Sequence, residues 1–387
     1  MTPGSFDPSV AECRRRRSTK WHHVPGDVLP AWVAETDFDL CPAVADAIVE
    51  TVRRGDVGYP DWPEEPLAEP FAQRMEARYG WRPDPAHVRH VSDLIQAMQV
   101  VTELSSAPGD GVVLHVPNYP PFLAALERMG RTPVPSPLLP AGAGWRFDAG
   151  RLAADVADAR PKVLLLVNPH NPTGRVFTRA ELEEVGEIAE RHDLVVVSDE
   201  LHAELAYPGH AHVPFASLGE HAARRTVTIT SATKSFNLGG LRTAVAHVGD
   251  ARVRDRWDRL PSELLGSVNV LGVEATLAAW RTGDDWLVRQ VAHLEAMRDH
   301  LVERVAGLPG VSMRRPEATY LAWLDCRATG LEDPAGHFRS RARVELVPGP
   351  NFGPGGEGYV RLNFGTGPAI LDEILDRMAK SLSRAAR

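Results

Sequence analysis

Short apolar runs alternate with helical patterns along the middle of the chain. The runs GVVLHV, KVLLLV, LVVVS and TVTITS occupy residues 111–116, 162–167, 194–198 and 226–231. Apolar residues recur at helical spacing in the segments before and between these runs, at residues 41–54, 93–106 and 179–192. Strands that are apolar on both faces and separated by helices predict an α/β fold with a mostly parallel sheet between helical layers.

The two ends of the chain differ from the middle. The first forty residues are rich in Pro and Trp and predict an extended arm. Residues 251–305 predict a long helical stretch, which leads to a smaller unit with strands at 320–325 and 359–364. We therefore expect an arm that joins the small domain, a large domain and a small α+β C-terminal domain, at residues 1–40, 41–285 and 286–387.

Composition narrows the class of protein. Of the 387 residues, 43% are hydrophobic and 24% are charged, which is typical of a folded globular chain with a large core. A net charge of -8 argues against a nucleic-acid partner, since such proteins are normally basic. The three cysteines are scattered without metal-ligand spacing, which favours a reducing cytoplasm and no metal site. No apolar run is long enough to span a bilayer, and no secretory signal is visible.

The segment SATKSFNLGGLR (231–242) carries the first candidate chemistry. Lys234 follows a predicted strand and turn, where a lysine of lowered pKa can form a Schiff base with a carbonyl compound. Ser231 and Arg242 are residue types that bind phosphate well, the arginine by a bidentate fork. Taken alone, Lys234 is more simply interpreted as an exposed loop lysine.

Two further motifs follow predicted strands. In VVVSDELH (195–202), Asp199 stands at a strand end, where a buried carboxylate needs a cation such as a protonated ring nitrogen. His202 could reach a hydroxyl on the same ring. The alternatives are that Asp199 caps a helix and that His202 is an ordinary core histidine. In NPHNPTG (168–174), Asn171 can donate its amide to a phenolate oxygen. The tight reversal leads us to expect a cis bond between Asn171 and Pro172.

Three more positions suit an anionic, planar ligand. Asp93 and Leu94 open a predicted helix, whose backbone N–H groups could hold a phosphate, although Asp93 also suits an ordinary cap. Tyr119 lies just past a strand end and could stack on a flat ring or simply pack. Arg361 stands within a predicted strand, where it needs an anion, either a substrate carboxylate or a structural partner.

Together these motifs resemble the aspartate-aminotransferase superfamily, whose cofactor is pyridoxal 5′-phosphate (PLP), in their kind, order and spacing. The resemblance covers nearly the whole chain. Within that superfamily the chain resembles the cystathionine β-lyase, or C–S lyase, branch that includes MalY and PatB. The stretches that carry this likeness are KWHHVPGDVLPAWVAETDF, VGYPDW, NPHNPTGRVF and SDELHAELAY, at residues 20–38, 57–62, 168–177 and 198–207.

The resemblance implies a role for each candidate. Lys234 would bind the cofactor as an imine, and Asp199 would pair with the pyridine nitrogen. Eight further residues would make the remaining cofactor contacts. These are Asn171, His202, Tyr119, Ser231, Arg242, Asp93, Leu94 and, from the second subunit of a homodimer, Tyr59. Arg361, Thr36 and Tyr119 would contact the substrate. Thr36 stands where the branch usually has methionine, and the phosphate loop lacks the glycine-containing turn common in the family.

The implied reaction is a β-elimination from cystathionine or another S-substituted cysteine, which gives a thiol, pyruvate and ammonia. A class I/II aminotransferase is the main alternative, since the same deprotonated substrate can be reprotonated on the cofactor. A tailoring enzyme that eliminates or decarboxylates a larger S-cysteinyl intermediate is another. A non-enzymatic regulator is disfavoured, because the set of Lys234, Asp199, Arg242 and Arg361 is intact.

Overall fold

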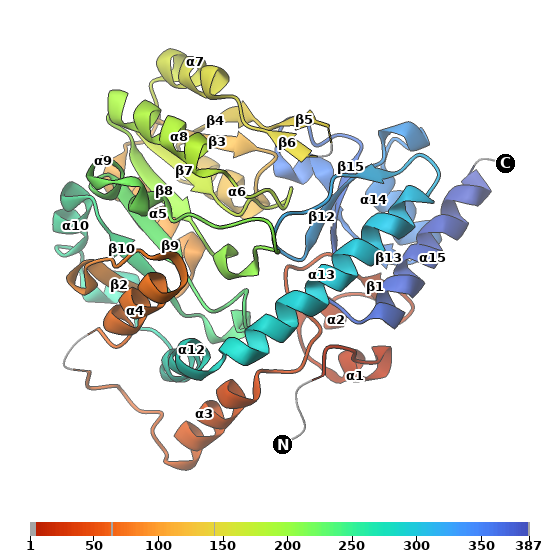
Figure 1. Cartoon of the computed structure of the whole chain (residues 1–387), viewed down its shortest axis with the longest axis horizontal. Helices are drawn as coiled ribbons and strands as arrows, with labels where there is room; N and C mark the ends of the chain where they lie inside the picture. Colours follow the sequence, from red (N-terminus) through yellow and green to blue (C-terminus); the bar gives the residue numbers. More distant parts are fainter. Residues whose placement is uncertain (1–4, 63–64, 143, 386–387) are drawn as a thin grey trace.

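A seven-stranded sheet forms the centre of the larger half of the molecule in the computed structural model, which describes residues 5–62, 65–142 and 144–385 (Figure 1). The strand order is β2-β10-β9-β8-β7-β3-β4. Strand β10 runs antiparallel to both of its neighbours, and the pairs from β9 to β4 are parallel. The strands are β2 (Val88–Val91), β3 (Gly111–Val116), β4 (Thr132–Pro137), β7 (Val163–Val167), β8 (Val195–Asp199), β9 (Thr226–Thr230) and β10 (Ala244–Val248). The mostly parallel α/β sheet expected from the apolar runs is confirmed.

Alternate residues of the central strands enter two different cores. Val112, Leu114 and Leu165 pack with α5 (Leu94–Ser105), α6 (Pro120–Arg128) and α10 (Ala251–Trp257). Val113 and Leu164 face the other side, against α7 (Ala149–Ala159) and α8 (Arg179–Arg191). Because side chains point to opposite faces at every second residue, a strand covered by helices on both sides must be apolar throughout. The helices in turn place the polar strand ends along one edge of the sheet.

A second, smaller sheet has the order β11-β12-β15-β14. Its strands are β11 (Ser312–Met313), β12 (Leu321–Asp325), β14 (Val347–Pro348) and β15 (Tyr359–Asn363). Two further strand pairs are β1 (Leu29–Pro30) with β13 (Val344–Glu345) and β5 (Leu139–Ala141) with β6 (Gly144–Arg146). The parallel β1–β13 pair joins the N-terminal segment to the C-terminal part of the chain. The domain boundary near residue 285 stays a prediction.

The N-terminal segment is not the extended arm that its composition predicted. It contains α1 (Val10–Arg15) and α2 (Thr19–His22), and Ser9 closes the first of these with a capping box to Glu12. The capping box satisfies backbone N–H groups that a short helix would otherwise leave open. The proline and tryptophan content of this segment therefore did not predict its two short helices.

The helical stretch expected at residues 251–305 is also interrupted. It consists of α10, α11 (Ser262–Leu265), α12 (Val270–Thr282) and α13 (Asp284–Ala306). Pro261 precedes α11 and Gly266, at φ +71°, follows it, so a continuous helix cannot form there. The remaining helices are α3 (Pro42–Arg53), α4 (Ala68–Tyr79), α9 (Glu220–Ala223), α14 (Pro334–His337) and α15 (Pro368–Ala385). Within the part of the chain that the structure describes, no helix is both long and apolar enough to cross a membrane.

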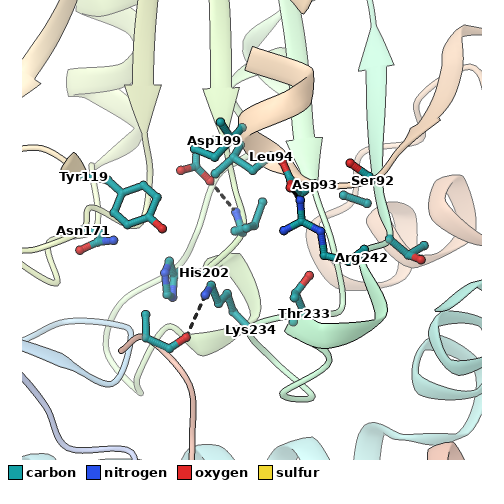
Figure 2. A pocket seen from close by; sticks show the side chains of 16 residues that line it. Ser92, Asp93, Leu94, Tyr119, Asn171, Asp199, His202, Thr233, Lys234 and Arg242 are labelled. Atoms are coloured by element: carbon teal, nitrogen blue, oxygen red, sulfur yellow. Dashed lines mark hydrogen bonds and ion pairs between the residues drawn. The ribbon is translucent and has the colours of Figure 1, made fainter. Parts of the chain in front are cut away.

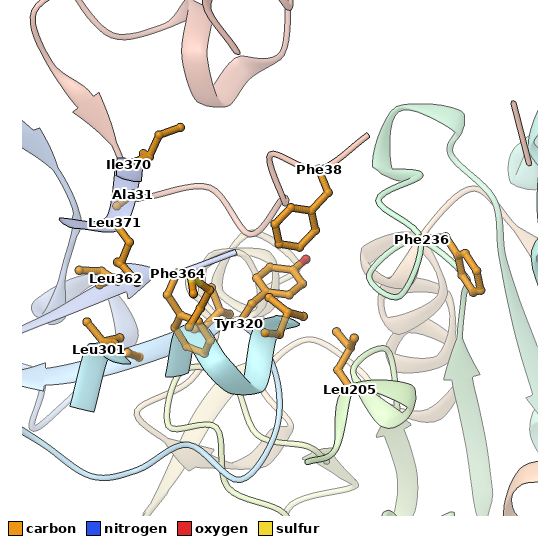
Figure 3. Packing of buried hydrophobic residues seen from close by; sticks show 14 of the residues in the cluster. Ala31, Phe38, Leu205, Phe236, Leu301, Tyr320, Leu362, Phe364, Ile370 and Leu371 are labelled. Atoms are coloured by element: carbon orange, nitrogen blue, oxygen red, sulfur yellow. The ribbon is translucent and has the colours of Figure 1, made fainter. Parts of the chain in front are cut away.

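A large apolar cluster fastens the two halves together. Phe38 from the N-terminal segment, Leu205, Phe236 and the small-sheet residues Tyr320 and Phe364 belong to it and are almost fully buried (Figure 3). Burial of one such side chain contributes roughly 1.5–3 kcal/mol relative to exposure. The cluster holds the N-terminal segment and the small sheet beside the carboxyl ends of the parallel strands, which is where ligands bind in open α/β sheets.

Candidate active site

A cavity at the carboxyl ends of the strands is lined by most of the candidate residues (Figure 2). Figure 2 shows Tyr119 and Asn171 on one side, Ser92, Asp93 and Arg242 on the other, and Asp199 and Lys234 between them. The lining candidates are Asp93, Leu94, Tyr119, Asn171, Asp199, His202, Lys234 and Arg242. The sheet topology has thus gathered residues up to 149 positions apart, as in the Asp93–Arg242 ion pair.

Lys234 lies just after β9, and its ammonium Nζ donates a hydrogen bond to the carbonyl oxygen of Ala34 at 2.8 Å. Burial lowers the pKa of Lys234 to about 8, and the nearby Arg361 charge adds to this effect. Asp199 opposes the shift. A lysine with this pKa is neutral in a sizeable fraction of molecules near physiological pH, as a nucleophile or base requires.

Asp199 is the last residue of β8 and is buried. One carboxylate oxygen accepts the backbone N–H of Leu201 at 3.1 Å, and the described residues provide no ion-pair partner within salt-bridge distance. Burial raises the pKa of Asp199 to about 7. A buried carboxylate without a cation is costly, so its surroundings fit a positively charged ligand atom.

Arg361, in the middle of β15, is the buried cation of the site. Its guanidinium donates to Oδ1 of Asn171 at 3.1 Å and to the carbonyl oxygen of Trp32 at 2.7 Å, and its Nε has no partner among the described residues. Burial lowers the pKa of Arg361 to about 10. No carboxylate of the described residues forms a salt bridge with it. This arrangement leaves the guanidinium available to an anionic ligand.

Asn171 and His202 line the same cavity as Lys234 and Asp199. The Asn171–Pro172 bond is cis, which confirms that prediction, and the Asn168–Pro169 bond is cis as well. His202 is buried, and its Nδ1 has no partner in the described parts of the chain. Burial, together with Lys234 and Arg361, lowers the pKa of His202 well below its ordinary value. The imidazole is therefore neutral and can serve as a hydrogen-bond donor or acceptor.

The opposite end of the cavity is built by the start of α5 and the loop after Lys234. Asp93 caps α5, because its carboxylate accepts the N–H of Gln96 at 2.8 Å, and its other oxygen pairs with Arg242. Asp93 is therefore an ordinary helix cap, as one interpretation of the sequence held. It also lies beside a cation at a helix N-terminus, the place where the other interpretation expected a phosphate. Ser231 is turned away: its hydroxyl donates to the carbonyl oxygen of Thr243 at 2.6 Å, and Thr233 lines the cavity instead.

Thr36 and Tyr59 lie outside this cavity. Thr36 is buried and lines a neighbouring cavity with Lys234 and Asn237. Its hydroxyl has no partner among the residues that the structure describes. Tyr59 is fully exposed in the single chain. Neither side chain lines the space around Tyr119 and Asn171, so their predicted ligand contacts stay predictions.

The residues that the sequence reasoning missed come from the segment 32–36 and its partners. Every backbone carbonyl of this segment except that of Thr36 accepts a hydrogen bond from Lys234, Tyr320, Arg361 or Asn363. Asn237 binds both backbone groups of Thr36. Asn237 stands three residues after Lys234, but an asparagine in a loop carries no signal of such a distant contact.

Known proteins are similar to this chain in sequence and in fold. The family model described as aminotransferase class I and II matches residues 33–378, which is most of the chain. The chain belongs to this PLP-dependent family.

Relatives of this family member include cystathionine β-lyases. The cystathionine β-lyase PatB of Bacillus subtilis is 35% identical, with 92% of this chain and 93% of the relative covered. A cystathionine β-lyase of Corynebacterium glutamicum is 33% identical over 97% and 99% of the two chains. The crystal structure of a PLP-bound C–S lyase from Staphylococcus hominis is 26% identical, covers 98% of each chain and has a TM-score of 0.92. The aspartate-aminotransferase-like fold predicted from the sequence is confirmed.

The residues of the cavity fit the cofactor of the family. A buried carboxylate without a cation, an unpartnered neutral imidazole and a lysine of lowered pKa face one space within the described chain, and a helix N-terminus with an arginine closes one end. These are the groups that a cationic ring nitrogen, a ring hydroxyl, an aldehyde and a phosphate would need. We therefore propose this cavity as the PLP site of this family member.

Proposed function

We propose that the protein is a PLP-dependent C–S β-lyase that acts on cystathionine or another S-substituted L-cysteine. The overall reaction takes the cysteine thioether and one water to a thiol, pyruvate and ammonia. The single observation that carries the proposal is the position of Lys234 between two adjoining cavities, one lined also by Asp199 and the other lined also by Arg361. The cystathionine β-lyases among its relatives and the C–S lyase structure support the choice of reaction.

Each of these residues would have a distinct task. Arg361 would bind the substrate carboxylate by a bidentate fork and so fix the orientation of Cα. Lys234, with its pKa near 8, would remove the proton from Cα. Asp199 would pair with the ring nitrogen of PLP and so favour its protonated form. When bound, PLP supplies the electron sink that tolerates negative charge at Cα.

The substrate's sulfur decides how the reaction ends. A thiolate at Cβ is a good leaving group, so its departure competes with return of the proton. An aminotransferase would instead release a keto acid and transfer the amino group to a second keto acid such as 2-oxoglutarate. The family description and the arginine–pyruvate transaminase of Pseudomonas aeruginosa, 30% identical over 91% of this chain and 89% of that relative, make this the second candidate.

The assay that tests the proposal separates these two outcomes. Purified holoenzyme is incubated with L-cystathionine or S-substituted cysteines, and thiol, pyruvate and glutamate are measured with and without 2-oxoglutarate. We expect thiol and pyruvate in equal amounts without 2-oxoglutarate. Keto-acid formation that depends on 2-oxoglutarate and yields glutamate without thiol would overturn the proposal in favour of transamination.

We also propose that the active form is a homodimer, and that the protein works in the cytoplasm. Four large apolar side chains stay exposed on α3 and the loop after it, namely Val49, Val52, Val57 and Tyr59. Exposed apolar residues gathered in one short segment are typical of an interface. A second copy is the expected partner, since Tyr59 would then be covered and could contact the partner's PLP site.

Sedimentation velocity tests this assembly. Val57→Asp should shift the protein from dimer to monomer and lower its activity, because a carboxylate would be buried in the interface. Val288→Asp, on the exposed surface of α13, is the matched control and should leave the dimer intact. A wild-type monomer with full activity would contradict the proposal.

A further inference from the structure

A second cavity of about 490 Å³ opens beside the cofactor site, and its wall includes Lys234, Tyr119 and Arg361. Most of its remaining wall is apolar and includes Trp32 and Pro120. Since Arg361 is placed to bind the substrate carboxylate, this space is where the rest of the substrate would extend. The wall of this cavity therefore determines which S-linked groups fit.

Glu345 is the one carboxylate among the described residues that line this cavity. It ends β13 and lies two residues before Val347, which pairs directly with Arg361 across the small sheet. Two residues of extended chain span roughly 7 Å. Glu345 and Arg361 thus come from neighbouring strand positions and line the same space.

One oxygen of Glu345 has no partner in the described structure. Oε1 accepts a hydrogen bond from Arg339 at 3.0 Å, whereas Oε2 is buried without any hydrogen bond. Arg339 itself is mostly exposed. An ionised oxygen removed from water without a donor costs free energy, and a ligand that supplies a donor recovers it. Among the described residues, the negative charge of Glu345 is therefore balanced by one exposed arginine alone, and a cation bound in the cavity beside Glu345 would add to that balance.

We propose that Glu345 determines the substrate class: it selects S-substituted cysteines whose S-linked group carries an ammonium or a comparable cationic N–H donor. This inference rests on the proposed C–S lyase activity. The α-carboxylate binds Arg361 and the distal cation binds the carboxylate of Glu345, so the substrate lies between two opposite charges. A distal carboxylate without an accompanying ammonium would face Glu345 and be repelled, whereas cystathionine carries both groups and could present its ammonium.

Three substrates of similar size test the proposal. The holoenzyme is assayed for thiol release from S-aminoethyl-L-cysteine, S-propyl-L-cysteine and S-carboxymethyl-L-cysteine. We expect kcat/KM to be highest for the aminoethyl compound and lowest for the carboxymethyl compound. In Glu345→Gln, kcat/KM for the aminoethyl compound should fall by about ten- to a hundredfold, the range of one charge-assisted hydrogen bond. The value for the propyl compound should change less than about threefold, well below that range.

Binding without turnover separates this inference from the lyase activity. L-lysine and L-norleucine contain no sulfur and cannot release a thiol. In calorimetric titrations of the holoenzyme, wild-type protein should bind L-lysine more tightly than L-norleucine, and Glu345→Gln should remove that difference. Arg339→Gln is the matched control: it removes the other partner of Glu345 but keeps the carboxylate, so the preference for the ammonium should persist.

Two combinations of results distinguish the inference from the reaction on which it rests. Absence of thiol release from all three substrates, combined with preferential lysine binding, would overturn the proposed reaction but support the role of Glu345. Thiol release with equal kcat/KM for the three compounds, and no effect of Glu345→Gln on substrate choice or lysine binding, would show that Glu345 forms only a structural ion pair with Arg339.

Discussion

The side chain of Asn237 holds both backbone polar groups of Thr36. Its Oδ1 accepts the Thr36 N–H at 3.0 Å, and its Nδ2 donates to the Thr36 carbonyl oxygen at 2.9 Å. Asn237 lies in the same turn as Lys234, so this pair fastens the N-terminal segment to the lysine loop. The carbonyl of Ala34, two residues before Thr36, accepts the hydrogen bond of Lys234 Nζ. Asn237 and Lys234 therefore both bind the backbone of residues 34–36.

Asn237→Ala should loosen this connection. We expect the free energy of unfolding to fall by roughly 1–3 kcal/mol, because two buried backbone groups lose their partner. The KM for substrate should also rise, since the segment 32–36 forms part of the site. Urea denaturation and steady-state kinetics measure the two effects. Thr36→Val keeps the backbone contacts and is the control; an equal effect in both variants would contradict the explanation.

Lys234→Ala should remove the covalent link to PLP together with thiol release. The chain has four lysines, Lys20, Lys162, Lys234 and Lys380, so reduction with borohydride followed by peptide mass spectrometry can locate the attachment without ambiguity. We expect the cofactor only on the peptide that contains Lys234. Lys162→Ala, an exposed position, should behave like wild type. Attachment that survives in Lys234→Ala would refute the assignment.

The lowered pKa of Lys234 predicts how cofactor loading depends on pH. Only the neutral amine attacks an aldehyde, and a pKa of about 8 leaves roughly a tenth of the molecules neutral at pH 7. The rate of covalent PLP attachment to the apoprotein should therefore rise with pH and level off above about pH 8. A rate that climbs steadily to about pH 10, where an ordinary lysine titrates, would be inconsistent with this environment.

Asp199→Asn should stabilise the apoprotein while it damages the enzyme. The folded-state pKa of Asp199, about 7, exceeds its ordinary value of 3.8, so folding takes up a proton between these values. Stability then falls as pH rises through this window, and the ionised form costs about 4 kcal/mol above it. In denaturant titrations the variant should gain most near pH 8 and progressively less toward pH 4. A variant that is less stable at every pH would mean that Asp199 makes a net stabilising contact.

Arg361→Lys should be strongly impaired, although the charge is kept. Lysine cannot provide the planar fork that grips a carboxylate, so kcat/KM for amino acids should fall at least about ten- to a hundredfold. An S-substituted cysteamine, which lacks the carboxylate, should lose much less affinity in a competition assay. Equal losses for both compounds would assign Arg361 a structural role through Asn171 and Trp32.

Much of this site could be predicted from the sequence because its residues lie at the ends of apolar strands. Asp199, Asn171 and Lys234 follow such strands closely, and the rule that ligands bind at strand ends predicts that the three meet. The contacts of Ala34, Asn237 and Asn363 could not be predicted, since they join segments about 200 to 330 residues apart through backbone atoms. Backbone carbonyls carry no sequence signal.

Errors in the fold prediction have similar causes. Proline and tryptophan in the first forty residues indicated an irregular segment, but the capping box at Ser9 and Glu12 supports a short helix there. At residues 251–305 the helical pattern hid three breaks, because Pro261, Gly266 and Gly283 occupy too few positions to disturb the periodicity. The phosphate-binding role of Ser231 was inferred from its residue type, its spacing from Lys234 and the family resemblance, none of which reveals that its hydroxyl donates to Thr243. That role stays a prediction.

The pairing of β1 with β13 has a consequence for synthesis on the ribosome. Leu29 leaves the exit tunnel among the first residues, whereas its partner Val344 follows 315 residues later. Strand β1 must therefore stay unpaired during nearly all of translation. Contacts of such long sequence separation are formed late and slowly. The pocket that contains Lys234 cannot be completed until Arg361 of β15 has also emerged, so truncated products cannot assemble it.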